Sequence, residues 1–306
     1  AGNITSAGQS FYNLIIDDTG DSITPQDALS VTNDLTMTAG TLNGTQNITV
    51  NGNVAGTAGT INLTGGTFEQ RASSSKNFGT TSGTTAWTFS SLTFSSSNAA
   101  GPCGTVTYST QTGGSGGITM TSVLLVGKSL DSCPTTLDAG NRTWTLSGTA
   151  GNPFQLLASP AGALTASTST FTYTGNNAAG NTTVQTATFY NLDTNNSSET
   201  FVLEGTTGAS NDLTVTLGTL DTTASNYAIN VTRDMTINGT FTANASTITV
   251  SRNWTFNTGA TLNRGTSTVV LNGDGSILGS ATTQFQSLSI GYSGKTTTLA
   301  ADTSRT

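Results

Sequence analysis

Histidine is absent from the 306-residue chain, and charged residues make up only 8% of it. Without imidazole, the sequence excludes nucleophilic triads that use histidine as the base and metal sites that use it as a ligand. The 9 basic and 16 acidic residues give a net charge of −7. No basic stripe can therefore neutralise phosphates, and we expect no nucleic-acid partner.

Long apolar runs and a targeting segment are also missing. The longest apolar stretch, residues 123–126, is far shorter than the roughly 20 residues that span a bilayer, so we expect no membrane insertion. Five prolines and no Gly-x-y period exclude a collagen-like fibre. The first residues, Ala-Gly-Asn-Ile-Thr, carry no basic and apolar leader, so we expect a processed or trimmed N-terminus.

Repeats are what the sequence does contain, in a background of Thr, Ser, Asn and 36 Gly. The block FYNL at 11–14 recurs at 189–192, and NDLTMTAGTL (33–42) agrees with NDLTVTLGTL (211–220) at eight of ten positions. Both recurrences have the offset 178, which indicates duplication. With weaker copies, super-repeats open near Phe11, Phe89, Phe189 and Phe285, within one continuous segment 1–306.

A shorter period lies inside each super-repeat. RDMTIN (233–238) aligns with RNWTFN (252–257) at an offset of 19, and TITV (247–250) aligns with TVVL (268–271) at 21. Apolar residues alternate with Thr, Ser or Asn and are interrupted by glycine turns, which is a strand pattern. A period of about 19–22 residues with two or three short strands predicts one rung of a parallel β-helix, or β-solenoid.

This prediction is an all-β fold. Every second residue of a strand is apolar and points into a narrow core that the stacked rungs share. A string of β-sandwiches is the alternative, but it predicts no period of 19–21 residues. Residues of about 95–185 break the rhythm, and we expect an irregular, loop-rich insertion there. The residues that we expect to point inward are Leu35, Met37, Ile48, Val50, Ile61, Leu63, Leu213, Val215, Ile229, Met235, Ile237, Ile248, Val250, Trp254, Phe256, Val269 and Leu271.

The repeat blocks resemble a known class of protein. FYNLIIDDTG, NDLTMTAGTLNG, RDMTINGTFTANASTITV and RNWTFNTGATLNRGTSTVVLNGDG are similar to repeats of Thr/Asn/Gly-rich, adhesin-like β-helix surface proteins of bacteria, in the style of autotransporter passengers and filamentous haemagglutinins. The resemblance covers most of the chain and covers residues 95–185 least well. It implies secretion, display at the cell surface and repeats that continue beyond one domain. It carries no catalytic or binding residues to this chain.

Two cysteines, Cys103 and Cys133, lie beside turn residues and are 30 positions apart. Their number fits no zinc site, which needs four ligands. We expect them to form one disulfide, which indicates an oxidising compartment. Two buried free thiols are the alternative.

Acidic residues are spread singly along the chain, so we predict no catalytic, cofactor-binding or metal site. Asp34 and Asp212 occupy equivalent repeat positions, where a structural role in a turn is expected. The densest acidic patch is Asp17, Asp18 and Asp21, with Asp27 nearby. Such carboxylates could hold Ca²⁺, but the order typical of calcium loops is missing, and a solvated turn is the simpler interpretation.

Two functions follow from these patterns. The first is a non-enzymatic structural or adhesive element: a rigid, threonine-rich stalk or fibre of an extracellular surface protein or filament. The alternative is a carbohydrate-binding or polysaccharide-cleaving β-helix whose site lies in the 95–185 insertion. That region holds both signs of charge and two aromatic residues that could stack on sugars. The residues concerned are Lys128, Asp131, Asp138, Arg142, Trp144 and Tyr173.

The expected partners follow from the repeat pattern. The fourth super-repeat stops at Thr306 in mid-repeat. We expect either a fragment of a longer surface protein or an end covered by another subunit, because an uncapped solenoid end exposes strand edges and apolar core. Neighbouring repeats or subunits, end to end, are therefore the expected partners, with surface glycans as a further class.

Overall fold

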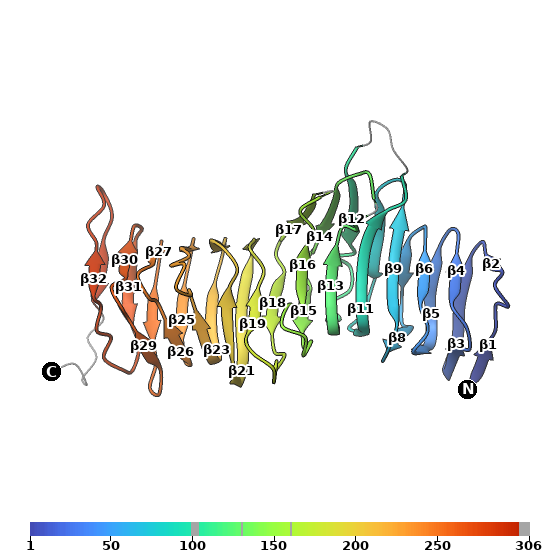
Figure 1. Cartoon of the computed structure of the whole chain (residues 1–306), viewed down its shortest axis with the longest axis horizontal. Coiled ribbons are helices and arrows are strands. Elements are labelled where there is room, and N and C mark those ends of the chain that lie inside the picture. The colour runs from blue at the N-terminus through green and yellow to red at the C-terminus, as the bar shows by residue number, and fades with distance from the viewer. Residues whose placement is uncertain (99–103, 130, 160, 300–306) are drawn as a thin grey trace. The chain divides into compact units, whose positions relative to one another are not determined.

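Parallel strands stacked in successive coils form the whole described part of the protein. The computed structural model describes residues 1–98, 104–129, 131–159 and 161–299. These residues contain strands and turns but no helix, and hence no helix that could cross a membrane. The coils form a β-solenoid of about 14 turns. Figure 1 shows the strands of successive coils side by side. The predicted fold class is confirmed, and the string of β-sandwiches is excluded.

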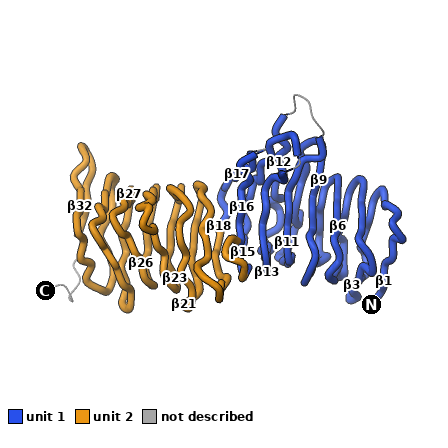
Figure 2. Tube along the Cα trace, viewed as in Figure 1, with its two compact units in different colours: residues 1–148, 153–169 blue, residues 149–152, 170–306 orange. Residues whose placement is uncertain are grey.

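The chain divides into two compact units, coloured in Figure 2. Unit 1 comprises residues 1–148 and 153–169, and unit 2 comprises residues 149–152 and 170–306. The strands of unit 1 are β1 (Gly2–Ile4), β2 (Ser10–Phe11), β3 (Leu14–Pro25), β4 (Leu29–Val31), β5 (Leu35–Gly44), β6 (Ile48–Val50), β7 (Val54–Gly56), β8 (Thr60–Leu63), β9 (Thr67–Ala72), β10 (Lys76–Thr80), β11 (Trp87–Ser96), β12 (Val106–Thr110), β13 (Ile118–Val126), β14 (Thr135–Asp138), β15 (Thr143–Leu146), β16 (Phe154–Leu156) and β17 (Gly162–Thr165).

The strands of unit 2 have the same short, alternating character. They are β18 (Thr170–Tyr173), β19 (Thr182–Val184), β20 (Thr188–Phe189), β21 (Asn191–Leu203), β22 (Thr207–Ala209), β23 (Leu213–Asp221), β24 (Ile229–Val231), β25 (Met235–Ile237), β26 (Thr240–Thr242), β27 (Thr247–Val250), β28 (Trp254–Phe256), β29 (Thr261–Asn263), β30 (Thr268–Leu271), β31 (Gly275–Leu278), β32 (Ser287–Ser289) and β33 (Thr297–Leu299).

Three columns of parallel strands run along unit 2. One column contains β18, the start of β21, the start of β23, β25, β28, β31 and β33. A second contains β19, the end of β21, the end of β23, β26 and β29. The third contains β20, β22, β24, β27, β30 and β32. Each coil from β18 to β30 thus adds one strand to each column, and main-chain bonds join it to the next coil.

The period of the sequence repeats equals the offset between residues that pair in consecutive coils. Met235 lies opposite Trp254, an offset of 19, and Ile248 lies opposite Val269, an offset of 21. Each inward residue therefore stacks on the inward residue of the next coil. All seventeen residues predicted to point inward are buried, with exposures of at most 4%. This part of the prediction is confirmed.

The number of residues in each coil of unit 1 increases along the chain, and we call the coils that contain β10 to β17 the wide coils. Leu35 pairs with Val54, an offset of 19, whereas Phe78 pairs with Thr110, an offset of 32, and Tyr108 pairs with Leu137, an offset of 29. The irregular stretch from about 95 to 185 therefore contains stacked strands joined by longer loops, rather than an insertion outside the stack. Figure 1 shows β12, β14 and β17 at the top of the view, in these wide coils.

Large aromatic side chains fill the interior of the wide coils. Phe78 contacts Trp87, Phe89 and Phe94, with ring centroids 5.5, 5.9 and 5.0 Å apart, and all four rings are buried. A wider coil encloses more volume, and aromatic rings fill that volume, with the one polar atom among them, Trp87 Nε1, bonded to the Gly59 carbonyl at 3.0 Å. The aromatic cluster is therefore the packing solution that a long coil requires.

The two copies offset by 178 residues adopt the same coil. Leu14 pairs with Leu35 in the first copy, as Leu192 pairs with Leu213 in the second, and both ladders shift register in the following residues. At that shift, Gly40 (φ +75°) and Gly218 (φ +78°) approach a carbonyl of the preceding coil. A Cβ atom would lie 2.4 and 2.2 Å, respectively, from that oxygen. Only glycine fits this position, which explains its presence in both copies.

Cys133 lies just before β14 in unit 1. Cys133 is buried, and no described cysteine is free. Cys103 lies outside the described residues, so the pairing of Cys103 with Cys133 stays a prediction.

Candidate functional site

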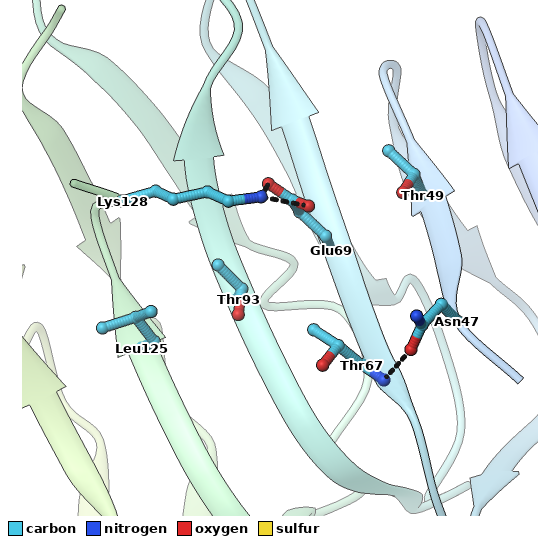
Figure 3. Close-up of a pocket in the computed structure, with 7 residues that line it drawn as sticks. All are labelled: Asn47, Thr49, Thr67, Glu69, Thr93, Leu125 and Lys128. Atoms are coloured by element: carbon cyan, nitrogen blue, oxygen red, sulfur yellow. Dashed lines mark hydrogen bonds and ion pairs between the residues drawn. The ribbon is translucent and has the colours of Figure 1, made fainter. Parts of the chain in front are cut away.

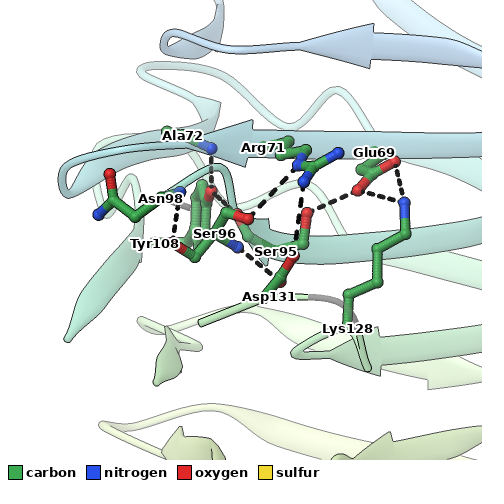
Figure 4. A network of polar contacts seen from close by, with 9 residues as sticks. All are labelled: Glu69, Arg71, Ala72, Ser95, Ser96, Asn98, Tyr108, Lys128 and Asp131. Carbon is green, nitrogen blue, oxygen red and sulfur yellow. Dashed lines mark hydrogen bonds and ion pairs between the residues drawn. The ribbon is translucent and has the colours of Figure 1, made fainter. Parts of the chain in front are cut away.

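A charged cluster of Glu69, Arg71, Lys128 and Asp131 lies on three consecutive coils of unit 1 (Figure 4). Glu69 and Arg71 lie on β9, which pairs in parallel with β11, and β11 in turn pairs with β13, just before Lys128. The stacking therefore brings together residues up to 62 positions apart. Outward positions elsewhere on these strands are mostly Thr and Ser, so the cluster is an exceptional feature of this face.

Glu69 and Lys128 form the outer part of the charged cluster. Lys128 Nζ lies 2.8 and 2.9 Å from the two carboxylate oxygens of Glu69. The Ser95 hydroxyl donates a further hydrogen bond, 2.6 Å long, to Glu69 Oε1. Both carboxylate oxygens are thus engaged, which fixes the Glu69 side chain between two coils.

Asp131 forms the inner part of the charged cluster, with a fully buried side chain. Its Oδ2 accepts a 2.8 Å hydrogen bond from the Ser96 amide, and its Oδ1 lies 3.7 Å from Arg71 Nη2. Burial raises the pKa of the Asp131 carboxyl, while the Ser96 amide and the Arg71 guanidinium oppose this rise. The guanidinium is needed there, because an unpaired buried carboxylate is costly.

Tyr108 connects the charged cluster to the core. Its hydroxyl accepts a 2.8 Å hydrogen bond from the Ala72 amide and donates to the Ser95 carbonyl. Burial raises the pKa of this hydroxyl well above its usual value. Tyr108 therefore stays protonated and joins the ends of two coils, and it has no access to a ligand.

A groove of about 340 Å³ opens beside Glu69 and Lys128 (Figure 3). Asn47 lines the side of the groove opposite Lys128. Its Oδ1 accepts a 2.8 Å bond from the Thr67 amide. The remaining lining is threonine and one leucine, and the two charges neutralise each other. Such a groove suits a neutral polar ligand. The lining residues are Asn47, Thr49, Thr67, Glu69, Thr93, Leu125 and Lys128.

The structure does not join the four charged residues that the sequence singled out into one site. Lys128 and Asp131 belong to the charged cluster, but Asp138 accepts bonds from the Ser167 hydroxyl (2.6 Å) and the Gly140 amide (3.1 Å). Arg142 is buried and donates to Gln111, Thr80 and Gly116, and burial lowers the pKa of its guanidinium. It holds three coils together.

The two aromatic residues proposed as sugar platforms are not available for stacking. Trp144 and Tyr173 are both fully buried. Trp144 Nε1 donates a 3.0 Å hydrogen bond to the Ala139 carbonyl, and the Tyr173 hydroxyl accepts one from the Gln185 amide. Both residues belong to the core.

Two of the four acidic residues near the start of the chain, Asp21 and Asp27, contact residues 20 or 21 positions earlier in the chain. Asp27 accepts hydrogen bonds from the amide and hydroxyl of Ser6 and from the Ala7 amide, and the bond from the Ser6 amide is the main reason that its pKa is lowered. Asp21 lies 2.9 Å from the α-amino group of Ala1. Among the described residues, no group of three or more acidic or cysteine side chains could hold a metal ion.

Asp34 and Asp212 have the structural role expected from their repeat positions. Asp34 Oδ1 accepts bonds from the amide and side chain of Asn53, at 2.7 and 3.2 Å. Asp212 Oδ1 accepts a 3.2 Å bond from the Asp234 amide. Each carboxylate thus tethers the next coil.

Sequence reasoning missed Glu69, Arg71 and Tyr108. Their partners lie 59, 60 and 13–36 positions away, in coils whose length shows no repeat. The one available signal was the segment TFEQRA (67–72), which places two charges on alternate residues of an otherwise uncharged strand region.

No family model matches the chain, and no curated protein and no solved structure matches it. The fold and the site therefore rest on the geometry described above, which defines a parallel β-solenoid.

Proposed function

We propose that this chain is a non-enzymatic structural or adhesive element of an extracellular surface protein or filament, in which it serves as a rigid repeat stalk. The observation that supports this most directly is that polar side chains form hydrogen bonds between neighbouring coils. Asp34 and Asp234 each bind an asparagine of the next coil, Asn53 and Asn253, through both its amide and its side chain. Arg142 and Asp131 likewise connect coils rather than face a cleft.

These contacts suit a rod that must resist unfolding and proteolysis. Hydrogen bonds that are buried or charge-assisted between coils add to the main-chain ladder. Outward threonines present a weakly charged surface that favours strand conformation. Stacked coils stabilise each other through nearest-neighbour interfaces.

Surface exposure is the test of this function. Protease treatment of intact source cells, followed by mass spectrometry, should release peptides of this chain from the loops between coils. Release only after lysis would contradict the proposed location. Incubation of the purified protein with a panel of polysaccharides should leave the number of reducing ends unchanged, whereas an increase would contradict the non-enzymatic role.

The groove beside Glu69 and Lys128 favours a second candidate, recognition of a neutral glycan. Thr49→Trp would fill the groove from β6. Thr236→Trp is the matched control, because Thr236 is likewise the half-buried middle residue of a three-residue strand, β25. On a glycan array, loss of binding in Thr49→Trp alone supports the groove. No binding by the unaltered protein contradicts it.

A further inference from the structure

The second column of strands in unit 2 is interrupted after β29. β29 pairs with β26 on one side, where Leu262 lies opposite Phe241, and no described strand pairs with its other side. The first and third columns continue past this coil, through β31 and β33 and through β32. The chain also continues, but residues 279–286, between β31 and β32, form no strand. The interruption therefore lies between two described coils of unit 2.

The residue at the interrupted position differs from those that precede it in the column. The inward residues of the preceding coils are Leu220, Phe241 and Leu262, at successive offsets of 21. The same offset leads to Thr283, whose Oγ1 is buried and has no hydrogen-bond partner among the described residues. A threonine fills less of a core than Leu or Phe, and its hydroxyl is costly to bury unpaired. The sequence therefore gives this segment no apolar residue to stack on Leu262 at this position.

A groove of about 350 Å³ lies at the interruption. Leu262 lines it and is half-buried, whereas Phe241 in the preceding coil is fully buried. Phe256 and Ala260 complete the apolar part of the lining. Such a volume and a mixture of apolar and polar groups are typical of ligand sites. The polar lining residues are Thr261, Arg264, Thr282 and Gln284.

The guanidinium of Arg264 has no counter-ion. Arg264 is exposed and forms no ion pair and no hydrogen bond with the described residues. Arg233 and Arg252, in the preceding coils, lie 3.3 and 3.7 Å from Asp234. None of the described residues that line the groove is acidic. Arg264 can therefore offer two parallel N–H groups to the carboxylate of a ligand.

We infer that this groove binds a carboxylated sugar residue, a hexuronate, of a surface polysaccharide. Arg264 binds the carboxylate through two parallel N–H···O bonds. Thr261, Thr282 and Gln284 carry groups that both donate and accept hydrogen bonds, as the hydroxyls of a sugar require. The unpaired charge distinguishes this groove from the groove in unit 1, whose two charges are paired with each other. The inference rests on the adhesive part of the proposed function and names an acidic ligand class for it.

Isothermal titration calorimetry of the purified chain with trigalacturonate tests the inference, and the methyl ester of this trisaccharide is the matched uncharged ligand. The acid should bind about tenfold more tightly than the ester, and Arg264→Gln should remove this difference. Arg264→Lys keeps the charge but loses the planar fork, so it should weaken binding of the acid about threefold. Arg252→Gln is the matched control, because Arg252 is an exposed arginine of the same unit that lies beside Asp234, and it should leave binding unchanged.

Several results would overturn the inference. One is no binding of the acid at millimolar concentration, and another is equal binding of the acid and the ester. A third is equal loss of affinity in Arg264→Gln and Arg252→Gln, once circular dichroism shows that both variants are folded. Tighter binding of a sulfated trisaccharide or of an acidic peptide would contradict a carboxylated sugar as the ligand. None of these results bears on surface exposure, which tests the proposed function separately.

Discussion

The coils at residues 11–44 and 189–221 share one design but differ in what precedes them. Asn13 Oδ1 accepts from the Asn33 side chain at 2.9 Å and from the Asp34 amide at 3.2 Å, and Asn191 Oδ1 accepts from Asn211 at 2.8 Å and Asp212 at 3.3 Å. The bonds toward the following coil are thus the same. Toward the preceding coil, the second copy is covered by β18 and its loop, whereas residues 14–16 of the first copy pair with no described strand on that side and β1 pairs only with residues 23–25.

This comparison separates two effects of sequence. Residues that bond to the next coil, such as Asn13 and Asn191, are retained between the copies. Residues that bond to the preceding coil have changed: Asn196 and Glu199 stand where the first copy has Asp18 and Asp21. The two copies thus differ at positions that bond to the preceding coil in the second copy.

The glycine at the register shift should give the largest effect. We expect Gly218→Ala to lower the free energy of unfolding by about 3 kcal/mol, because it combines left-handed strain with a close approach to the Asn196 and Glu199 carbonyls. Gly40→Ala should cost about half as much, since residues 17–21 are exposed and can shift. Urea denaturation measures both.

Gly259→Ala is the control for backbone strain alone. Gly259 has φ +88° but no atom within 4 Å of a Cβ, so its replacement should cost about 1 kcal/mol. Equal losses for Gly218→Ala and Gly259→Ala would contradict the close approach.

The buried carboxylate of the second copy should give the next largest effect. Glu199→Gln removes one acceptor of the two amide bonds to the preceding coil, which should cost about 2 kcal/mol. Asp21→Asn, at the equivalent position, should change stability by less than about 0.5 kcal/mol because Asp21 is exposed. Chemical denaturation of the two variants side by side checks this. A comparable loss in both would show that the first copy is covered too.

The asparagine that links consecutive coils should contribute to stability in both copies. Asn13→Ala and Asn191→Ala each remove an acceptor of two hydrogen bonds to the next coil, which should cost about 1 kcal/mol. Asn191→Ala also removes the 3.1 Å bond to Thr170 Oγ1, so its loss should be larger by about 0.5 kcal/mol. Thermal unfolding of the two variants provides the measurement. A loss in Asn191→Ala alone would mean that the first copy does not form the same coil.

The smallest effect concerns pH. Burial raises the pKa of Asp193 above 3.8, although a hydrogen bond from Thr216 opposes the rise. The folded state therefore binds the proton more tightly than the unfolded state, and wild-type stability falls as pH rises through the window above 3.8. Asp193→Asn should lack this fall, so that its stability relative to wild type increases from pH 3 to pH 7. The opposite slope in paired urea titrations would contradict the burial.

The sequence allowed the period, the fold class and the inward rows to be predicted. Offsets of 19 and 21 in the aligned blocks reappear as the pairings Met235–Trp254 and Ile248–Val269. The wide coils were not predictable in the same way, because an offset of 32 between Phe78 and Thr110 leaves no repeated pattern to align. The charged cluster was missed for that reason, since the widening of the coils decides which residues meet Glu69 and Asp131.

Amide hydrogen exchange at equivalent positions tests the comparison most directly. The amides of Leu14 and Leu192 both bond to the next coil, to the Asp34 and Asp212 carbonyls at 3.0 Å, so the amides of Ile15 and Asp193 point toward the preceding coil. In dilute protein, we predict slow exchange at Leu14, Leu192 and Asp193 and fast exchange at Ile15. Equal protection of Ile15 and Asp193 at the lowest concentration, or fast exchange at both Leu14 and Leu192, would contradict the account.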